Sequence, residues 1–339
     1  MAYVTSAVIG PAVKEKFNRM LLKRVQPYLT AHYFAYKYTM PMNSGDTMVM
    51  RRYGTLPPAV ASLTEGSAGT ETPVSVNDIK VLIKQYGSFQ RVSDWSQYTT
   101  QENVANELAN SFSLQMGITL NKLYFDLLNT CASVMYASGG VISASAATPG
   151  YVTEKDVRLA VSLIHSGNAR PLTTAVQGRD AYYTFPIRPA YWGLGHSDIL
   201  SYDLQKIPSF IASANYPNNN VVISGMEVGA VLDTRWMTST EGIKITTGSL
   251  SGVTGAATAT TTDPHYALFI TGDQAYGGVQ LGRDMGQLIF KDFGSSGIAD
   301  PLNQWASIGW KMSWGGAILN DRWMIKMICR NSYNFTPAP

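Results

Sequence analysis

The sequence predicts an α+β fold organised around one long helix. Three observations support this: apolar residues recur at helical spacing over residues 94–136, strand-like runs lie on both sides of that stretch, and charged residues are scarce. Charged residues make up 14% of the 339 residues, against about 25% in a typical soluble domain, while the hydrophobic share of 45% is ordinary. Because interface cores are depleted of charge, we expect much of the surface to be buried against other subunits.

The N-terminal residues are expected to form a basic arm rather than a domain. The net charge of the whole chain is +3, too low for a general polyanion binder, yet residues 1–40 carry a balance of +5 and the remainder sums to −2. Residues 12–36 favour a helix with one apolar face, which Pro27 is expected to kink or end. The cations of this arm, opposed by Glu15 alone, are Lys14, Lys16, Arg19, Lys23, Arg24 and Lys37.

Residues 45–53 and 79–86 are predicted to pair as the two strands of a hairpin. The second strand alternates apolar side chains with a polar face that includes Lys80 and Lys84. The 25 residues between the strands would be unusual as a structureless loop inside a compact domain, and an isolated two-stranded hairpin is marginal in water. Both features are explained if the hairpin projects and docks on a neighbouring molecule. A mobile surface hairpin without a partner is the alternative.

The long helix is predicted over residues 94–136, with Asp94 as a cap at its start. About 35 residues at about 1.5 Å each make a rod of about 50 Å, which so few charges would leave poorly soluble unless it is covered on more than one face. Polar residues interrupt every window of about 20 residues, so the helix is not a membrane span. A coiled coil is disfavoured because no second long heptad follows. The periodic apolar positions are Val104, Leu108, Phe112, Met116, Leu120, Leu123, Leu127, Cys131 and Val134.

An inserted subdomain is expected over residues of about 151–265. Thr153 and Asp156 form a capping pair for a short helix that Pro171 is expected to stop, with Val157, Ala160, Val161 and Ile164 on its inner face. After this helix we expect a buried strand at 181–187, an irregular stretch at 191–220, strands at 221–224 and 230–238, and a low-complexity surface loop at 246–262.

The C-terminal part is predicted to return to β-structure. Strands are expected at 266–271 and 287–292, followed by runs 305–314 and 317–329 around a two-residue turn at Gly315-Gly316. The tryptophans at 305, 310 and 314 favour core or interface packing over a ligand pocket. The alternating apolar stripe suited to packing on the long helix is Ala306, Ile308, Trp310, Met312 and Trp314.

The sequence offers no catalytic, cofactor or metal site. His32, His165, His196 and His265 lack metal-ligand spacing, and no serine lies in a nucleophile-elbow motif. Residues 272–278 are glycine-rich but lack the Gly-Lys-Ser/Thr ending of a phosphate loop, so a turn is expected. Cys131 and Cys329 are interpreted as small buried apolar residues, with an oxidised pair as the alternative. With no signal peptide visible, folding in a reducing cytoplasm is expected.

Several stretches, in their shared order, resemble a known family. They are Gly45-Asp-Thr-Met-Val-Met-Arg-Arg-Tyr53, Leu63-Thr-Glu-Gly66, Gln85-Tyr-Gly87 with Val92-Ser-Asp94, Ile223-Ser-Gly-Met-Glu-Val-Gly229 with Thr234-Arg-Trp236, Gln274-Ala-Tyr-Gly277, and Asp300-Pro-Leu-Asn-Gln304 with Gly309-Trp-Lys311. Their order, together with the arm, hairpin and long helix, resembles the major capsid proteins of tailed bacteriophages, whose fold is named for phage Hong-Kong-ninety-seven. The resemblance is closest to the capsid protein of N-four-like podoviruses.

The resemblance implies the tailed-phage major capsid fold and a division of the chain into named parts. These are an N-terminal arm (1–42), an extended hairpin loop (43–92), a peripheral domain with the spine helix (93–150), an axial domain (151–265) and a return to the peripheral domain (266–339). It implies self-assembly into hexamers and pentamers of an icosahedral head around double-stranded DNA, bound without sequence specificity. The expected location is the virion capsid, assembled in the host bacterial cytoplasm without a membrane.

The resemblance also implies partners and contact residues. A portal and a decoration or cement protein are expected, and since only about 40 residues precede the hairpin, so is a separate scaffolding protein. Lys14, Lys16, Arg19, Lys23 and Arg24 would face inward toward DNA phosphates or an acidic scaffold, a solvated helix face being the alternative. The expected inter-subunit hairpin residues are Arg51, Arg52, Leu63, Glu65, Lys80 and Lys84. Two rival functions remain: an encapsulin-like nanocompartment shell and, with less support, a polysaccharide-active enzyme using the aromatic-rich residues 182–216.

Overall fold

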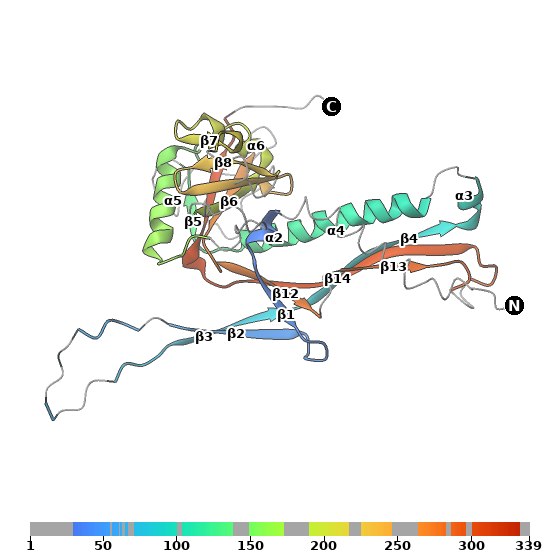
Figure 1. The fold of residues 1–339 in the computed structure, drawn as a ribbon, viewed down its shortest axis with the longest axis horizontal. Helices are drawn as coiled ribbons and strands as arrows, with labels where there is room; N and C mark the ends of the chain where they lie inside the picture. Colours follow the sequence, from blue (N-terminus) through green and yellow to red (C-terminus); the bar gives the residue numbers. More distant parts are fainter. Residues whose placement is uncertain are drawn as a thin grey trace, which may run out of the picture.

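The computed structural model shows an elongated α+β molecule with one long helix, two main sheets and a projecting hairpin (Figure 1). The expected arm helix up to residue 29, the strands at 181–187 and 221–224, and the loop at 246–262 lie outside the described residues. The residues that the structure describes are 30–54, 56–60, 62, 65–66, 71–99, 104–137, 149–172, 190–216, 225–245, 264–282, 286–295 and 300–332.

The spine is helix α4 (Val104–Asn129), whose 26 residues span about 39 Å. A separate short helix, α3 (Asp94–Thr99), begins where the sequence places a helix start. The prediction of one rod over 94–136 is therefore too long. No helix in the described part of the chain is long and apolar enough to cross a membrane.

The spine helix ends early because the residues after it are held by other elements. The Thr130 hydroxyl donates to the Leu127 carbonyl over 2.7 Å, which closes the last turn. The Ser133 hydroxyl then donates to the Asp321 carbonyl over 2.6 Å, and Val134 begins strand β5 (Val134–Tyr136), which pairs parallel to β15 (Met324–Arg330). Tertiary pairing thus overrides the helical spacing of these apolar residues.

The first main sheet is built around strand β14 (Trp305–Ile318). Strand β4 (Lys84–Ser93) runs antiparallel along one edge of β14, while β13 (Gly286–Lys291) and β12 (Tyr276–Leu281) follow each other along the opposite edge. Strand β1 (Tyr36–Met40) joins parallel to β12. The strands predicted at 266–271 and 287–292 are confirmed as β11 (His265–Thr271) and β13.

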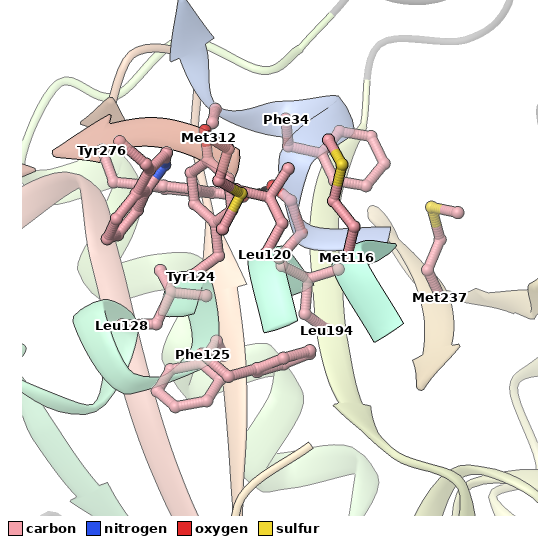
Figure 2. Packing of buried hydrophobic residues seen from close by; sticks show 14 of the residues in the cluster. Phe34, Met116, Leu120, Tyr124, Phe125, Leu128, Leu194, Met237, Tyr276 and Met312 are labelled. Carbon is pink, nitrogen blue, oxygen red and sulfur yellow. Dashed lines mark hydrogen bonds between the residues drawn. The ribbon is translucent and has the colours of Figure 1, made fainter. Parts of the chain in front are cut away.

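The predicted apolar stripe of β14 is confirmed as the face that packs on α4. All five of its residues are buried, and Ile308, Trp310 and Met312 belong to one core with the apolar face of α4. Figure 2 shows Met312 in this core with Met116, Leu120 and Tyr124 of α4. The indole Nε1 of Trp310 donates to Gln115 Oε1 over 2.9 Å, which adds a directional bond to this packing. Trp305 lies outside this core: it is five residues from Trp310, so its ring points to the other face of the strand.

The predicted turn at Gly315-Gly316 is wrong, because β14 continues straight through both glycines. They serve close packing: a Cβ at Gly315 would lie 2.7 Å from the Leu82 carbonyl, and one at Gly316 would lie 2.8 Å from Leu127 of the spine. The chain instead turns after Ile318 through the 3₁₀ helix η7 (Asp321–Trp323) into β15.

The second main sheet has the order β5-β15-β11-β6-β9-β8-β7, with β10 also paired to β11. It therefore combines strands of residues 191–245 with strands from both flanking parts of the chain. The remaining strands of this sheet are β6 (Tyr191–His196), β7 (Phe210–Ala212), β8 (Glu227–Val231), β9 (Thr234–Ser239) and β10 (Lys244–Ile245). Short helices α6 (Ser197–Leu200), η3 (Leu204–Lys206) and η4 (Ser213–Asn215) connect β6 to β8 through β7.

Helix α5 (Glu154–Ser166) confirms the capping prediction and packs on this second sheet. The Asp156 carboxylate accepts hydrogen bonds from the Thr153 amide (3.0 Å) and hydroxyl (2.6 Å). The four predicted inner-face residues of α5 are all buried. The helix ends at Ser166 rather than at Pro171, because Asn168 adopts a left-handed conformation with φ of 56°.

Two predictions within 191–245 are wrong. The stretch expected to be irregular contains β6, a buried central strand whose Gly193 lets the Trp236 ring lie directly against the backbone. The single strand expected at 230–238 is two antiparallel strands, β8 and β9, joined by a tight turn in which Leu232 has φ of 53°. Alternation alone does not reveal such a turn, because leucine is not a typical turn residue.

A buried asparagine on the spine helix joins three parts of the fold. Asn121 Oδ1 accepts from the Thr30 hydroxyl and the Ala31 amide, both over 3.2 Å, so it anchors helix α2 (Thr30–Phe34). Asn121 Nδ2 donates to the Ser239 hydroxyl over 2.8 Å, which ties the spine to β9 of the second sheet. One side chain thus aligns the incoming arm, the spine and the second sheet.

Replacing Asn121 by leucine is expected to destabilise the soluble subunit by about 1–3 kcal/mol, because buried groups on Thr30, Ala31 and Ser239 lose their partner. Urea unfolding followed by tryptophan fluorescence measures this change. The matched control is Lys122→Leu at the next, exposed position, for which a change within about 0.5 kcal/mol is expected. Equal effects of the two substitutions would contradict this role of Asn121.

His32 makes the α2–α4 contact sensitive to acid. Burial, assisted by the charge of Lys37, lowers the pKa of His32 from 6.5 to about 3, and its Nδ1 lies 3.2 Å from the Tyr124 hydroxyl. Between these two pH values the unfolded chain binds a proton that the folded chain does not. The contribution to stability is therefore complete above pH 6.5 and is lost progressively as the pH falls toward 3.

The wild type is accordingly expected to lose more unfolding free energy than His32→Gln between pH 7 and pH 4. Glutamine keeps a polar group beside Tyr124 but cannot titrate. Urea midpoints at several pH values measure the difference, and parallel curves for the two proteins would show that His32 does not supply it.

Candidate subunit-contact surfaces

The projecting hairpin is the third sheet, formed by β2 (Thr47–Tyr53) and β3 (Val76–Leu82). The predicted pairing of these strands is confirmed, although β3 begins three residues earlier than expected and the chain from Lys84 onward belongs to β4. The hairpin extends away from the rest of the molecule (Figure 1).

The inner face of the hairpin packs on the body. Val81 and Ile83 are buried with Met40 and Val279 in a small core, against which Met48 and Met50 of β2 also pack. The Ile83 amide donates to the Asp46 carbonyl over 2.8 Å at the point where β3 passes into β4. Because β4 is paired along β14, the root of the hairpin is continuous with the first main sheet.

The structure gives the predicted hairpin residues different roles. Arg51 forms an exposed pair with Asp78 of the opposite strand (Nε to Oδ1, 2.8 Å), and its hydrogen bonds lower the pKa of that carboxyl group. Arg52 Nη1 donates to the Leu319 carbonyl over 3.0 Å and so fixes the hairpin to the turn between β14 and β15. Both arginines are thus engaged within the subunit. Lys80, Lys84 and Glu65 are exposed, and Leu63 lies outside the described residues.

The connection between β2 and β3, residues 54–75, will be called the hairpin loop. Its described residues from 56 to 60 and from 71 to 75 are all exposed, including the apolar side chains of Leu56 and Val60. The loop contains two acids, Glu65 and Glu71, and no lysine or arginine. It is therefore an acidic segment with exposed apolar side chains.

The five arm cations proposed to face inward, Lys14, Lys16, Arg19, Lys23 and Arg24, lie outside the described residues. Only helix α2, next to the spine, shows where the following chain enters the body. The packing of Phe34 on Trp192, with ring centroids 4.4 Å apart, holds this entry point in place.

A second exposed surface, which the sequence reasoning missed, lies on the face of the first main sheet opposite the spine. Strand alternation and register place Phe89, Ile289 and Trp305 on this face, where 69%, 41% and 44% of each residue is exposed. They line a groove of about 550 Å³, whose lining also includes Gly87 and Gly309. The sequence does contain one indication of this face. The predicted inner stripe consists of even-numbered residues, whereas Trp305 is odd-numbered, so strand alternation places Trp305 on the opposite face.

Charged residues around this groove are almost all basic. Arg91, Lys291 and Lys311 line it and are exposed. The acid among its lining residues, Asp300, is buried, and its carboxylate accepts the Trp305 amide over 2.8 Å. We call this surface, defined by Phe89, Ile289 and Trp305 with these three cations, the basic groove.

Clusters of ionisable side chains in the second sheet are engaged internally. Asp198 Oδ2 accepts from Lys244 Nζ (2.8 Å) and from the Tyr266 hydroxyl (2.9 Å), and burial, followed by these interactions with Asp198, raises the pKa of Tyr266 to about 12. Arg235 and Glu227 form a buried bidentate pair of 2.6 and 2.9 Å between β9 and β8. The first cluster thus joins α6 to β10 and β11, and the second joins β8 to β9.

Comparisons with known proteins show which solved structures have a similar fold. No protein-family model and no curated protein matches the sequence. Among solved structures, the capsid of Ralstonia phage GP4 matches with a TM-score of 0.62 at 13% identity, covering 90% of this chain and 88% of that chain. The head of Helicobacter pylori bacteriophage KHP40 matches with a TM-score of 0.60 at 8% identity, covering 87% of each chain.

The capsid of Cyanophage P-SCSP1u matches in the same way, with a TM-score of 0.56 at 14% identity and coverage of 88% of this chain and 87% of that chain. These matches extend over most of both chains, so they apply to the whole arrangement rather than to one motif. The narrower resemblance to N-four-like podoviruses stays a prediction. The chain therefore has the α+β fold of tailed-phage capsid proteins, as its sequence resemblance implies.

Proposed function

We propose that this chain is a major capsid protein whose copies assemble into the icosahedral head of a tailed phage around double-stranded DNA. The observation that carries the proposal is the match of nearly the whole chain, at TM-scores of 0.55 to 0.62, to subunits of phage capsids and heads. A structural role also fits the internal engagement of the ionisable clusters in the second sheet.

The exposed apolar surface of the subunit supports assembly. Apart from the basic groove, Trp95 and Leu302 are 74% and 75% exposed, at the end of the molecule where the Asp94 amide donates to the Gln304 carbonyl over 3.0 Å. Large apolar side chains exposed close together mark interaction sites in soluble proteins. An isolated subunit would carry it at a cost in solubility.

Assembly energetics explain how weak contacts make a stable shell. Obligate interfaces bury about 2,000–5,000 Å², a gross gain of tens of kcal/mol at about 25 cal/mol per Å², most of which lost motion and imperfect polar pairing offset. Single contacts therefore stay reversible while a closed shell, with every subunit held on several sides, is very stable. This combination permits correction of errors during assembly.

In this proposal the parts of the chain have separate roles. Residues of about 151–265 form the axial domain at the capsomer centre, the spine helix and the returning β-region form the peripheral domain, and the hairpin overlaps an adjacent subunit. The location is the virion capsid, after assembly in the host bacterial cytoplasm. A separate scaffolding protein, a portal and a decoration or cement protein are the further partners.

Two other functions are less well supported. An encapsulin-like shell has a related fold, but the matched solved structures cited above all come from phages. A polysaccharide-active enzyme would need several aromatic residues on an accessible surface; in the described part of the aromatic-rich region Tyr191 and Trp192 are buried, whereas Tyr202 is exposed. An encapsulin would enclose a protein cargo and no genome, which the contents of purified particles reveal.

Removing the hairpin loop tests the assembly proposal. Replacing residues 56–73 by Asn-Gly should leave β2, β3 and the body folded, because the inner face of the hairpin packs on the body independently of the loop. The variant is expected to give soluble subunits or capsomers that do not close. Electron microscopy of wild type and variant, each expressed with its scaffolding protein, measures shell formation.

The outcomes of this comparison separate two claims. Closed shells from the variant would show that the loop is not required for assembly. Failure of the wild type itself to form shells with scaffolding protein and under packaging conditions would overturn the proposed function.

The arm cations are expected to act on the packaged polyanion or on an acidic scaffold. Changing Lys14, Lys16, Arg19, Lys23 and Arg24 together to glutamine should lower the yield of DNA-filled heads or the recruitment of scaffold, because phosphate and carboxylate contacts are lost. A matched control changes Lys155 on α5 to glutamine. Normal yields of filled heads from the fivefold variant would contradict the inward-facing role.

A further inference from the structure

A small hollow lies where helix α2, the spine and the second main sheet meet. Thr30, the first residue that the structure describes, lines it together with Ile118 of the spine and Met226 just before β8. Ile118 and Met226 are only partly buried, and Leu114, one helical turn before Ile118, is 38% exposed. In the described part of the chain, this strip of the spine is therefore incompletely covered.

The size of the hollow indicates side chains as its occupant. Its volume of about 120 Å³ is well below the about 300–1,000 Å³ of typical ligand sites. It is comparable with a cavity of about 150 Å³ that accepts a single benzene ring. One or two apolar side chains would fill it.

Polar groups of the hollow restrict the occupant further. Glu241 is the one charged residue in the described lining, so the site favours an occupant with a cation. The Thr238 hydroxyl, also in the lining, is buried and has no hydrogen-bond partner among the described residues. Since such groups are rare in a completed interior, we expect further chain to cover this surface.

The arm directly before α2 has the required composition. One face of the helix predicted for this segment combines four apolar residues with one cation: Phe17, Met20, Leu21, Arg24 and Val25. Pro27 is expected to end or kink that helix before α2, which permits the arm to change direction. The arm therefore offers both the apolar side chains and the positive charge that the hollow favours.

The arm of the same subunit has an advantage over any other occupant. Thr30 is itself part of the lining, so Val25 is five residues away, at most about 18 Å in an extended chain. Such a short connection gives the attached segment a high effective concentration at the hollow. A helix of a scaffolding protein or of another copy would have to displace it.

We propose that arm residues 17–25 fold back onto their own subunit and cover this hollow. Leu21 and Val25 pack against Ile118 and Met226, which supplies the apolar burial. Arg24 pairs with the carboxylate of Glu241, which fixes the rotation of the arm helix about its axis.

The docked arm divides its cations into two groups. Lys16, Arg19 and Lys23 recur at spacings of three and four residues, so they share the helix face that points away from Arg24. Arg24 is used within the subunit, whereas these three stay accessible to DNA phosphates or an acidic scaffold. This division rests on the proposed function and narrows the inward-facing contact to three residues.

Disulfide trapping in soluble subunits tests the docking directly. The variant Val25→Cys with Ile118→Cys places two thiols in the proposed contact, while the native Cys131 and Cys329 are buried. Oxidation of subunits purified without scaffolding protein should link the new pair in most molecules, as peptide mass spectrometry measures. The matched control, Lys23→Cys with Ile118→Cys, puts the arm cysteine on the opposite helix face and should link at least about tenfold less.

Isotope labelling identifies the subunit to which the docked arm belongs. In an equal mixture of ¹⁵N-labelled and unlabelled subunits, both peptides of each linked pair should carry the same label. Pairs of mixed label would assign the hollow to the arm of another copy. Equal linking of test and control pairs, or no link between positions 25 and 118, would show that the arm does not dock here.

Charge exchange provides an independent test. Arg24→Glu and Glu241→Arg should each raise the rate of chymotrypsin cleavage after Phe17 about tenfold, since like charges then face one another or one partner is lost. The double variant should return to within about twofold of wild type, because the pair is opposite in sign again. Lys23→Glu makes the same charge change on the opposite face and should leave the cleavage rate within about twofold.

Two outcomes of this comparison would exclude the pairing. One is equal acceleration by Arg24→Glu and Lys23→Glu. The other is failure of the double variant to recover while circular dichroism shows that its subunits remain folded.

The division of the cations has its own test in assembled heads. Changing Lys16, Arg19 and Lys23 together to glutamine should lower the yield of DNA-filled heads as much as the fivefold variant does. Normal yields from this threefold variant would overturn the division.

The docking and the proposed function fail separately. Docking is measured on single subunits, so its result does not depend on whether they assemble. Wild-type shells filled with DNA would establish the capsid function whether or not the arm docks.

Discussion

The packing of the spine helix α4 against strand β14 is the contact on which the rest of the subunit depends. Both elements are long, about 39 Å for the helix and about 46 Å for the 14-residue strand, so the contact between them is an extended seam. The seam combines the buried stripe of β14 with a directional bond from Trp310 to Gln115. Glycines at 315 and 316 bring the strand close to its neighbours where side chains would not fit. Other parts of the fold are attached to this seam. Asn121 on the spine helix holds the end of the arm and the second sheet through its hydrogen bonds with Thr30 and Ser239.

A seam of this shape leaves surfaces that the subunit alone does not cover. In the described part of the chain, β4 and β13 pair only with β14, so each has an open edge, and the sheet face away from the helix exposes Phe89, Ile289 and Trp305. The hairpin extends from the other end, rooted in the body by its inner face and by the bond from Arg52 to Leu319. Open edges and exposed apolar faces are normally covered or paired.

Much of the fold was predictable where local pattern and tertiary environment agree. The α5 capping pair, the stripe of β14 and the pairing of β2 with β3 follow from spacing that the final packing keeps. Predictions were wrong where a neighbouring element decided the local structure. The helical spacing through Val134 was overridden by pairing with β15, the glycines expected to turn lie inside β14, and a turn at Leu232 divides a run that alternation joins. Of the candidate site, the hairpin was predicted, whereas the basic groove was not, because its lining comes from three strands distant in sequence.

The sequence by itself determined the α+β class, the long apolar periodicity of the spine, the scarcity of charge and the acidic, cation-free hairpin loop, since these are properties of composition and spacing. Its motifs, in their shared order, also indicated the capsid fold that the solved phage structures match. Only the tertiary structure decided where the spine ends, that Asn121 joins three parts, and that Arg91, Lys291 and Lys311 surround one apolar groove. The reason is physical: strand register places residues far apart in the chain on the same face, and no local pattern specifies that register.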